Sequence, residues 1–108
     1  MYNESIVSIK NLIKLNPTHS EYYANLYTVL LNVDSTKEAL ECINKAIKYN
    51  ESNLDYNFYR ADLNYKLRNW KDCISDYNKY LKVDVNKVAS VYLSRGIADY
   101  ALQTGEPP

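Results

Sequence analysis

Apolar residues recur along this chain every three or four positions, with polar residues between them. The clearest runs are Leu26, Val29, Leu30 and Val33, then Leu40, Ile43, Ala46 and Ile47, and then Ile74, Tyr77 and Leu81. This spacing collects apolar side chains on one face of an α-helix. The sequence lacks the alternation of period two that marks a half-buried strand. The chain is therefore predicted to be all-α.

Polar residues in front of these runs predict where helices begin. Residues 18–21, 35–38 and 52–55 each place a hydroxyl side chain three positions before an acidic residue, which is the pattern of a capping box. Asn69 and Asp72 open a further helix in the same manner. Gly105 is followed closely by two prolines and predicts the end of the last helix, because glycine adopts a left-handed cap and proline cannot continue a helix.

Three similar segments lie 34 residues apart. They read NLIKLNP, KAIKYNE and KYLKVDV, and they bring Pro17, Glu51 and Val85 into register. Other columns of the same alignment are Lys14, Lys48 and Lys82, then Ile6, Leu40 and Ile74, and then Ser5, Ala39 and Cys73. A fixed period of this length indicates an array of helical hairpins, in which each hairpin buries its apolar face against its neighbours.

Residues 20–53 and 54–87 resemble two repeats of the tetratricopeptide repeat (TPR) family. The family has two small residues seven positions apart in its second helix, and Ala39 and Ala46 supply them in the first repeat. The second repeat keeps a small residue only at Cys73, with Tyr80 at the other site and Trp70 at the family's aromatic turn position. Pro17 matches the proline between repeats. The resemblance implies a right-handed superhelical array, and a scaffold that many unrelated proteins use.

The two ends of the chain match the family only in part. Residues 3–16 resemble the second helix of a preceding repeat, and residues 88–104 resemble the first helix of a following repeat or a capping helix. The alignment of residues 88–104 with the preceding repeat requires an offset of 35 residues, at which Arg95 corresponds to Arg60. We therefore expect six helices in one domain, residues 1–108, taken from a longer array.

The charge balance, the apolar runs and the cysteines indicate which partners and which cellular location to expect. The 13 basic and 13 acidic residues give a formal net charge of zero, so no global field attracts nucleic acid or an anionic membrane. No apolar run is long enough to span a bilayer, and the N-terminus does not read as a signal peptide. Cys42 and Cys73 fall at different helical phases, which disfavours a disulfide. These features predict a cytoplasmic protein.

Catalytic chemistry finds little support in the sequence. His19 is the only histidine, and no cysteine pair, Ser/His/Asp set or glycine-rich phosphate loop accompanies it. A metal site would need His19, Cys42 and Cys73 from three separate elements. Asp55 and Asp62 are read as a solvated helix face rather than an acid/base pair. The chain is predicted to be no enzyme and to hold no metal or cofactor.

The TPR resemblance implies a concave groove lined by the first helix of each hairpin, where the family binds extended peptides or a partner's helix. By position, the groove residues are Glu21, Ala24, Asn25, Thr28, Leu31, Asn32, Asp55, Phe58, Asp62, Tyr65, Lys66, Ser90, Leu93, Ile97 and Tyr100. Carboxylates outnumber lysine in this set, and aromatic and aliphatic groups accompany them. The expected partner is a protein or peptide with a basic residue and an apolar anchor. Alternatively, some of these apolar residues pack against a continuation of the array.

Some family members bind the C-terminal carboxylate of heat-shock chaperones with a clamp of lysine, asparagine and arginine. Asn25 matches the asparagine of that clamp. The next repeat carries Asp55 and Tyr59 where the clamp needs lysine and arginine. Arg60 is adjacent but points about 100° away around the helix. The sequence therefore argues against binding of such a tail.

Many tyrosines fall where the family packs helix against helix. They are Tyr22, Tyr23, Tyr27, Tyr56, Tyr59, Tyr77, Tyr80 and Tyr92. A structural role fits them better than ligand stacking. Tyrosines in this arrangement would also suit base stacking in an RNA-binding helical repeat. RNA binding needs clustered basic residues for the phosphates, and the neutral net charge argues against it.

The leading hypothesis is a non-catalytic interaction scaffold. A second hypothesis is the regulatory or targeting arm of a larger enzyme or chaperone cofactor, and the third is RNA binding. Self-association through apolar end faces is compatible with all three. Those faces comprise Ile6, Ile9 and Ile13 at one end, and Ile97 and Tyr100 at the other.

Overall fold

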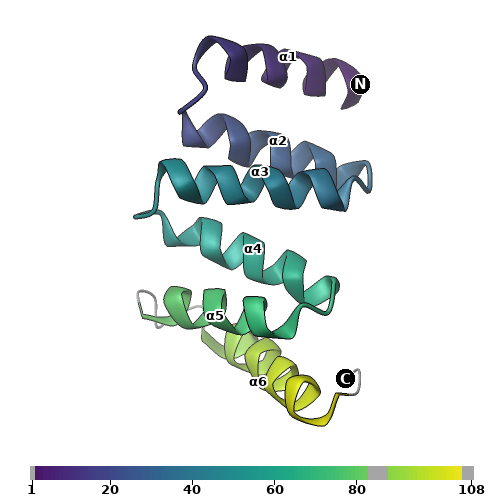
Figure 1. The fold of residues 1–108 in the computed structure, drawn as a ribbon, viewed down its shortest axis with the longest axis vertical. Helices are drawn as coiled ribbons and strands as arrows, with labels where there is room; N and C mark the ends of the chain where they lie inside the picture. The colour runs from purple at the N-terminus through teal and green to yellow at the C-terminus, as the bar shows by residue number, and fades with distance from the viewer. Residues whose placement is uncertain (1, 83–87, 106–108) are drawn as a thin grey trace. The chain divides into compact units, whose positions relative to one another are not determined.

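The computed structural model describes residues 2–82 and 88–105 (Figure 1). These residues form six helices and no strand, which confirms the all-α prediction. The helices are α1 (Tyr2–Leu15), α2 (Ser20–Asn32), α3 (Thr36–Tyr49), α4 (Leu54–Lys66), α5 (Trp70–Leu81) and α6 (Val88–Thr104). The predicted end of the second repeat, at residue 87, and the two final prolines lie outside the described residues.

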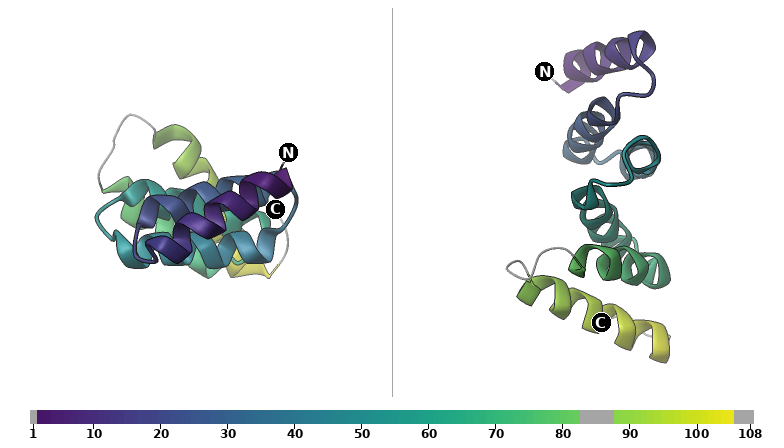
Figure 2. Two further views of the ribbon diagram at one scale, coloured as in Figure 1. Left: turned by 90° about the horizontal axis from the view of Figure 1, so that it is seen from above. Right: turned by 90° about the vertical axis from the view of Figure 1, so that its left-hand side faces the viewer.

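The chain divides into two compact units, residues 1–56 and residues 57–108. The boundary falls inside α4, directly after Tyr56. Unit 1 therefore contains α1, α2, α3 and the first turn of α4, and unit 2 contains the rest of α4 with α5 and α6. The views of Figures 1 and 2 agree that α2 lies beside α3 in unit 1, and that α5 lies beside α6 in unit 2.

The core of unit 1 is the hairpin of α2 and α3. Its buried side chains are Tyr23, Leu26, Tyr27 and Leu30 from α2, and Ala39, Cys42, Ile43 and Ala46 from α3. Ala39 and Ala46 are both fully buried, in agreement with the small sites expected in the second helix. Small side chains at these two positions let the backbones of the helices approach closely.

Helix α1 packs on α2 but contributes no fully buried residue. Ile6, Ile9 and Ile13, which the sequence places on an exposed apolar face, are half-buried instead. The exposed apolar residues of α1 are Tyr2, Val7, Leu12 and Leu15. The apolar face expected at this end of the chain is therefore only partly exposed.

The two hairpin turns have the same backbone geometry. In the first, the Ser35 amide donates to the Leu30 carbonyl at 3.0 Å and the Asp34 amide donates to the Leu31 carbonyl at 3.3 Å. These two bonds define a Schellman motif, with Asp34 in the left-handed region at φ 59°. The second turn repeats the bonds 34 residues later and places Arg68 at φ 62°.

Those turns explain why two predicted capping boxes do not form. Ser35 and Asn69 both end one helix and precede the next, with ψ angles of 64° and 73°, and neither makes a side-chain cap bond. An extended backbone is needed to aim a cap side chain at the next turn. His19, not Thr18, precedes α2, again without a side-chain cap. Asn53, rather than Ser52, accepts from the Asp55 amide at 3.2 Å and caps α4.

The core of unit 2 combines three helices. Ala61 of α4, Cys73, Tyr77 and Tyr80 of α5, and Val91 and Ala98 of α6 form one buried cluster. Trp70 packs on Tyr65, with ring centroids 5.5 Å apart, close to the predicted aromatic turn. Gly105 has φ 71° and ends α6, as predicted.

Most of the tyrosines pack as predicted, but not all of them do. Tyr23, Tyr27, Tyr56, Tyr77 and Tyr80 are buried. Tyr59 and Tyr92 are exposed, so the packing prediction is wrong for these two. Tyr92 lies instead under the Arg95 guanidinium, 4.8 Å from its ring centroid.

Candidate functional site

In unit 1, the expected binding residues form one polar stripe on α2. Glu21, Asn25, Thr28 and Asn32 are all exposed and recur at spacings of three and four. The Thr28 hydroxyl donates to the Ala24 carbonyl at 3.2 Å, and the Asn32 amide donates to the Thr28 carbonyl at 3.0 Å. Part of their hydrogen-bonding capacity is therefore used within α2. Asp55 is exposed in the first turn of α4.

In unit 2, the structure brings some of the expected residues together around a cavity. The cavity measures about 180 Å³ and is lined by Phe58 and Asp62 of α4, Tyr77 of α5, and Ser90, Val91 and Ser94 of α6. Phe58, Asp62 and Ser90 belong to the set that the sequence places in the groove. A cavity of this size admits one side chain, since pockets for drug-sized ligands measure roughly 300–1,000 Å³.

A carboxylate and a phenol define the polar wall of this cavity. The Tyr77 hydroxyl donates to Asp62 Oδ1 at 2.7 Å. Burial raises the pKa of Tyr77, and the hydrogen bond and negative charge of Asp62 raise it further. Tyr77 therefore remains a neutral donor at ordinary pH. The half-buried Asp62 carboxylate has several acceptor positions, of which this bond uses one, so the wall can accept further donors.

The other expected residues of unit 2 do not line this cavity. Tyr65 packs against Trp70. Lys66 is exposed in the last turn of α4. Leu93 and Tyr100 are exposed on another face of α6, and Ile97 is half-buried.

Sequence reasoning did not single out Tyr77 or Ser94 as binding residues. Tyr77 was assigned to packing because it lies in a second helix. A signal was nevertheless present, since Tyr77 is in register with the buried Ile43. A hydroxyl at a position that is apolar in the other repeat needs a partner, and that partner marks a polar environment.

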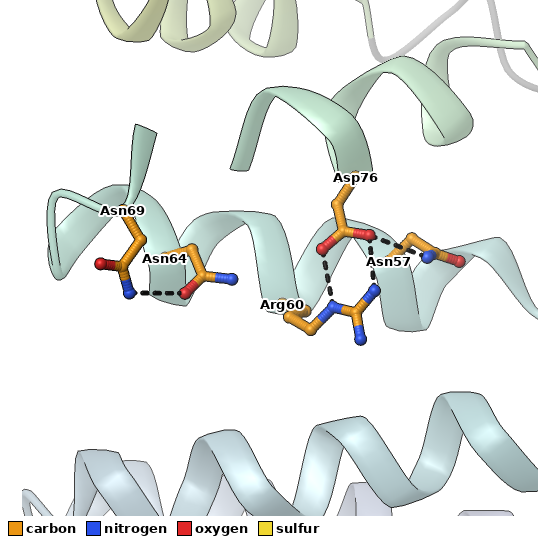
Figure 3. Close-up of polar contacts among 5 residues, drawn as sticks. All are labelled: Asn57, Arg60, Asn64, Asn69 and Asp76. Carbon is orange, nitrogen blue, oxygen red and sulfur yellow. Dashed lines mark hydrogen bonds and ion pairs between the residues drawn. The ribbon is translucent and has the colours of Figure 1, made fainter. Parts of the chain in front are cut away.

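A second polar cluster in unit 2 holds α4 to α5, and its members Asn57, Asn64 and Asp76 are buried (Figure 3). The Arg60 guanidinium donates to both oxygens of Asp76, with Nε at 2.7 Å and Nη2 at 2.9 Å. The Asn57 amide also donates to Asp76, at 3.0 Å, and the Asn69 amide donates to Asn64 Oδ1 at 3.0 Å. Among the described residues, every buried side-chain nitrogen and oxygen has a hydrogen-bond partner. This cluster supports the fold, and it engages the Arg60 guanidinium with Asp76.

The two thiols are buried, and the acidic groups of the described residues form no metal-binding cluster. Cys42 and Cys73 are buried free thiols, and burial raises the pKa of each to about 11. A thiol with so high a pKa is a weak nucleophile at neutral pH. Among residues 2–82 and 88–105, no group of three His, Cys, Asp or Glu side chains is placed to hold a metal ion. No helix in the same residues has the length and apolar character needed to cross a bilayer.

Comparisons with known sequences give two short matches and no matching family model. The chain is 30% identical over 69 residues to the human protein general transcription factor 3C polypeptide 3, covering 64% of this chain and 8% of that protein. It is 27% identical over 82 residues to a DnaJ homolog subfamily C member 3 homolog of Dictyostelium discoideum, covering 72% and 16%. The chain thus spans only a small part of the curated relatives that it matches.

Solved structures match nearly the whole chain. The TPR domain of Arabidopsis OM64 has a TM-score of 0.78 at 18% identity, covering 92% of this chain and 81% of that one. MamA has a TM-score of 0.81 at 22% identity, covering 96% and 59%. The TPR2B domain of yeast Sti1, in a complex with pHsp70, has a TM-score of 0.73 at 18% identity, covering 95% and 84%. With its six helices in hairpin order, the chain therefore has the tetratricopeptide repeat fold.

Proposed function

We propose that the chain is a non-catalytic interaction module that binds an extended peptide or a helix of a partner protein. The observation that carries this proposal is the unit 2 cavity, where α4, α5 and α6 bring Phe58, Asp62 and Tyr77 around a space of one side chain. The likeness to the Sti1 TPR2B domain supports a peptide partner, because that structure is a complex with pHsp70. Pockets that each receive one side chain give specificity in the recognition of extended peptides.

The chemistry of the cavity favours a basic anchor residue. Asp62 offers a carboxylate that Tyr77 orients at 2.7 Å, and Phe58 adds an aromatic wall. A lysine or arginine side chain can place its apolar stem along Phe58 and its charged end at Asp62. Apolar neighbours of that residue would contact the exposed aliphatic and aromatic groups of unit 2. The partner is therefore a segment with a lysine or arginine beside apolar residues.

An acidic chain end is a poor partner for the same surface. Asp55 and Tyr59 stand where the chaperone-binding clamp of the family needs lysine and arginine. Arg60 does not replace them, because both oxygens of Asp76 already bind its guanidinium. Asn25 alone cannot neutralise a carboxylate pair. The ligand preference proposed for this chain is thus opposite in charge to that of the clamp.

A second candidate function is the regulatory or targeting arm of a longer protein. The matched segments make up only 8% and 16% of the two curated relatives, which favours this candidate. In that case the cavity would dock the arm to a partner, and a catalytic domain would lie elsewhere in the same protein. RNA binding is the weakest alternative because the net charge is zero.

The binding proposal is tested with synthetic extended peptides that carry one lysine or arginine between apolar residues. Each peptide is paired with a version that has norleucine at the basic position. We expect measurable binding of the basic peptides by calorimetry and a loss of about tenfold or more with norleucine, since hydrogen bonds to charged groups contribute about 1.5–3 kcal/mol.

The variant Asp62→Asn locates the binding. It keeps an acceptor for Tyr77 but removes the charge, so it should weaken the basic peptides and leave the norleucine peptides unchanged. Glu41→Gln, at an exposed position of α3 in unit 1 that is outside the expected groove, is the matched control and should bind like the wild type. Equal affinity for basic and norleucine peptides, or equal effects of the two substitutions, would contradict the proposal. Retention on a polyanion that weakens with added salt would favour RNA binding instead.

A further inference from the structure

The Asp62 carboxylate in the unit 2 cavity has no cationic partner among the residues that the structure describes. The ion pairs of those residues use Glu21, Glu38 and Asp76 as their acids. Asp62 is half-buried, and its Oδ1 atom accepts from the Tyr77 hydroxyl at 2.7 Å. Opposite charges attract more strongly where protein replaces part of the surrounding water. The carboxylate is therefore suited to a cation from outside the described part of the chain.

The same unit shows how a carboxylate between α4 and α5 holds a cation (Figure 3). Asp76 accepts a neutral hydrogen bond on Oδ1, from the Asn57 amide at 3.0 Å. Its two oxygens also accept from the Arg60 guanidinium, at 2.7 Å and 2.9 Å. A neutral donor on Oδ1 thus leaves room for a guanidinium that bridges both oxygens. Asp62 already has the neutral donor, in Tyr77, and it matches Asp76 without the arginine.

A further hydrogen bond holds the Tyr77 hydroxyl in place. The Ser94 side chain bonds to this hydroxyl, and Ser94 must be the donor because the single proton of Tyr77 goes to Asp62. Tyr77 therefore has no proton left to donate to a ligand. The polar wall presents carboxylate oxygens that need donors, and a guanidinium has donors and no acceptor.

Phe58 supplies a flat surface beside the carboxylate. Phe58 and Asp62 are four positions apart in α4, so they are neighbours on one face of the helix, and both line the cavity. Guanidinium groups stack on aromatic faces. The chain contains such a contact elsewhere in unit 2, where the Arg95 guanidinium lies 4.8 Å from the ring centroid of Tyr92. An arginine lying on Phe58 would carry its donors to Asp62.

A lysine side chain satisfies the same charge less well. Its ammonium group is a compact and strongly hydrated point charge, whereas a guanidinium is planar, more weakly hydrated and able to bridge two carboxylate oxygens. The cavity of about 180 Å³ leaves little space for water beside a bound side chain. Loss of hydration therefore costs the ammonium more than the guanidinium.

We propose that the unit 2 cavity selects arginine over lysine, with the guanidinium bridging the two oxygens of Asp62 and its plane lying on the Phe58 ring. This inference rests on the proposed function, because it specifies which basic residue of the partner is the anchor. The contact repeats between two molecules the pairing that Arg60 and Asp76 make within one. The partner is thus a segment with an arginine beside apolar residues.

Three peptides of one sequence separate the charge of the anchor from its hydrogen-bonding geometry. They are acetylated and amidated, have leucine and alanine around the anchor, and carry arginine, lysine or citrulline at that position. Lysine keeps the charge without the planar pair of donors, and citrulline keeps planar donors without the charge. By calorimetry, arginine should bind about tenfold more tightly than either, which is the effect of one further hydrogen bond to a charged group.

Two variants test the bridge and the stack. Asp62→Asn should weaken both charged peptides and remove the preference for arginine. Phe58→Leu should weaken the arginine peptide more than the lysine peptide. Tyr92→Leu replaces an exposed aromatic residue outside the cavity, so it is the matched control and should keep the wild-type ratio of affinities. Circular dichroism checks the helix content, and the ratio in the wild type tests the selection without any substitution.

The outcomes separate this inference from the proposed function. If none of the peptides binds the wild type, the proposed function fails and the inference fails with it. If lysine binds as tightly as arginine or more tightly, basic anchoring stands and the selection of arginine is overturned. An arginine preference that survives Asp62→Asn would overturn the bridge, and one that is unchanged in Phe58→Leu would overturn the stack.

Discussion

The two hairpins of this chain share one backbone design but have interiors of different polarity. The α2–α3 hairpin of unit 1 places Leu26 and Cys42 at positions that are occupied by Arg60 and Asp76 in the α4–α5 hairpin of unit 2. The same 34-residue step relates Tyr23 to Asn57 and Leu30 to Asn64. Both hairpins turn through the same Schellman motif. The fold therefore tolerates an apolar or an ionic interior at these positions.

The difference in interior polarity shows which features the hairpin requires. A buried charge is costly unless it is paired and hydrogen-bonded, and in unit 2 the charge of Asp76 is satisfied by Arg60 and Asn57 together. One position stays small and fully buried in both hairpins, as Ala39 in unit 1 and Cys73 in unit 2. A small residue at this position and the turn geometry are the features that the two hairpins share. Polarity elsewhere is free to change if every buried group has a partner.

The largest expected effect comes from breaking the ion pair of unit 2. Asp76→Ala leaves the partly buried Arg60 guanidinium and the buried Asn57 amide without their carboxylate, and we expect a loss of about 3 kcal/mol in the free energy of unfolding. Trp70 is the only tryptophan and lies in unit 2, so its fluorescence in urea reports this loss. Asp72→Ala, at an exposed position of the same helix, should lose less than about 1 kcal/mol.

Replacing the ion pair together with its hydrogen-bonded amide sharpens the comparison. The triple substitution Asn57→Tyr, Arg60→Leu and Asp76→Cys gives these three positions the residues that unit 1 has there. Well-packed apolar replacements of buried ion pairs are often neutral or stabilising by about 1–4 kcal/mol. A triple variant as unstable as Asp76→Ala would show that the two hairpins are not equivalent at these positions.

The next largest effect tests the shared small positions. Ala39→Leu in unit 1 and Cys73→Trp in unit 2 each force extra volume into a fully buried site, and each should cost about 1–3 kcal/mol. Chemical denaturation followed by circular dichroism measures both. If either variant kept wild-type stability, the alignment of the two hairpins would be wrong.

High pH should weaken both units through their thiols. Burial raises the pKa of Cys42 and Cys73 to about 11, from 9.0 in an exposed thiol. Because the folded thiols hold their protons more tightly, their contribution is complete below pH 9 and is lost as pH rises to about 11. We expect a loss on the order of 1–3 kcal/mol for each thiol, measured from urea midpoints.

Removing a thiol isolates its part in this pH dependence. Cys42→Ala and Cys73→Ala should each flatten the decline between pH 9 and 11. Part of the decline should persist in both, because burial also raises the pKa of Tyr23 and Tyr77. A variant that follows the wild-type curve throughout this range would show that its thiol does not contribute.

The smallest effect distinguishes the two turns. Arg68 and Asp34 both adopt left-handed backbone angles, which cost a typical side chain about 1–2 kcal/mol and cost Asp less. Arg68→Gly should therefore stabilise the protein by about 0.5–1 kcal/mol after the greater entropy of unfolded glycine is included. Asp34→Gly should change stability less. A larger gain from Asp34→Gly would reverse the expected order.

Much of the fold could be predicted from local patterns. Helical spacing and the 34-residue period led to six helices, because both follow from repeated apolar contacts along one face. The caps were predicted less well. Ser35 and Asn69 carry suitable side chains, but the Schellman turns give them backbone angles from which those side chains make no cap bond. A capping motif describes side chains alone, and the preceding helix decides the backbone.

The candidate site could be predicted only in part. Register placed Phe58, Asp62 and Ser90 on first helices, and these residues do line one cavity. Tyr77 was missed because its contribution depends on how α5 packs under α4. Leu93 and Tyr100 share a helix with Ser90 but lie on another face of it, since the exposed side of α6 depends on which neighbours cover it.

The sequence by itself determined the helices, their order and the tetratricopeptide repeat fold, because each depends on local spacing and on a period that is visible in the chain. Only the tertiary structure decided that Arg60 and Asp76 pair between α4 and α5 and that Tyr77 donates to Asp62. The physical reason is that these features arise from contacts between helices. Residues that meet across helices are not marked by their own local sequence.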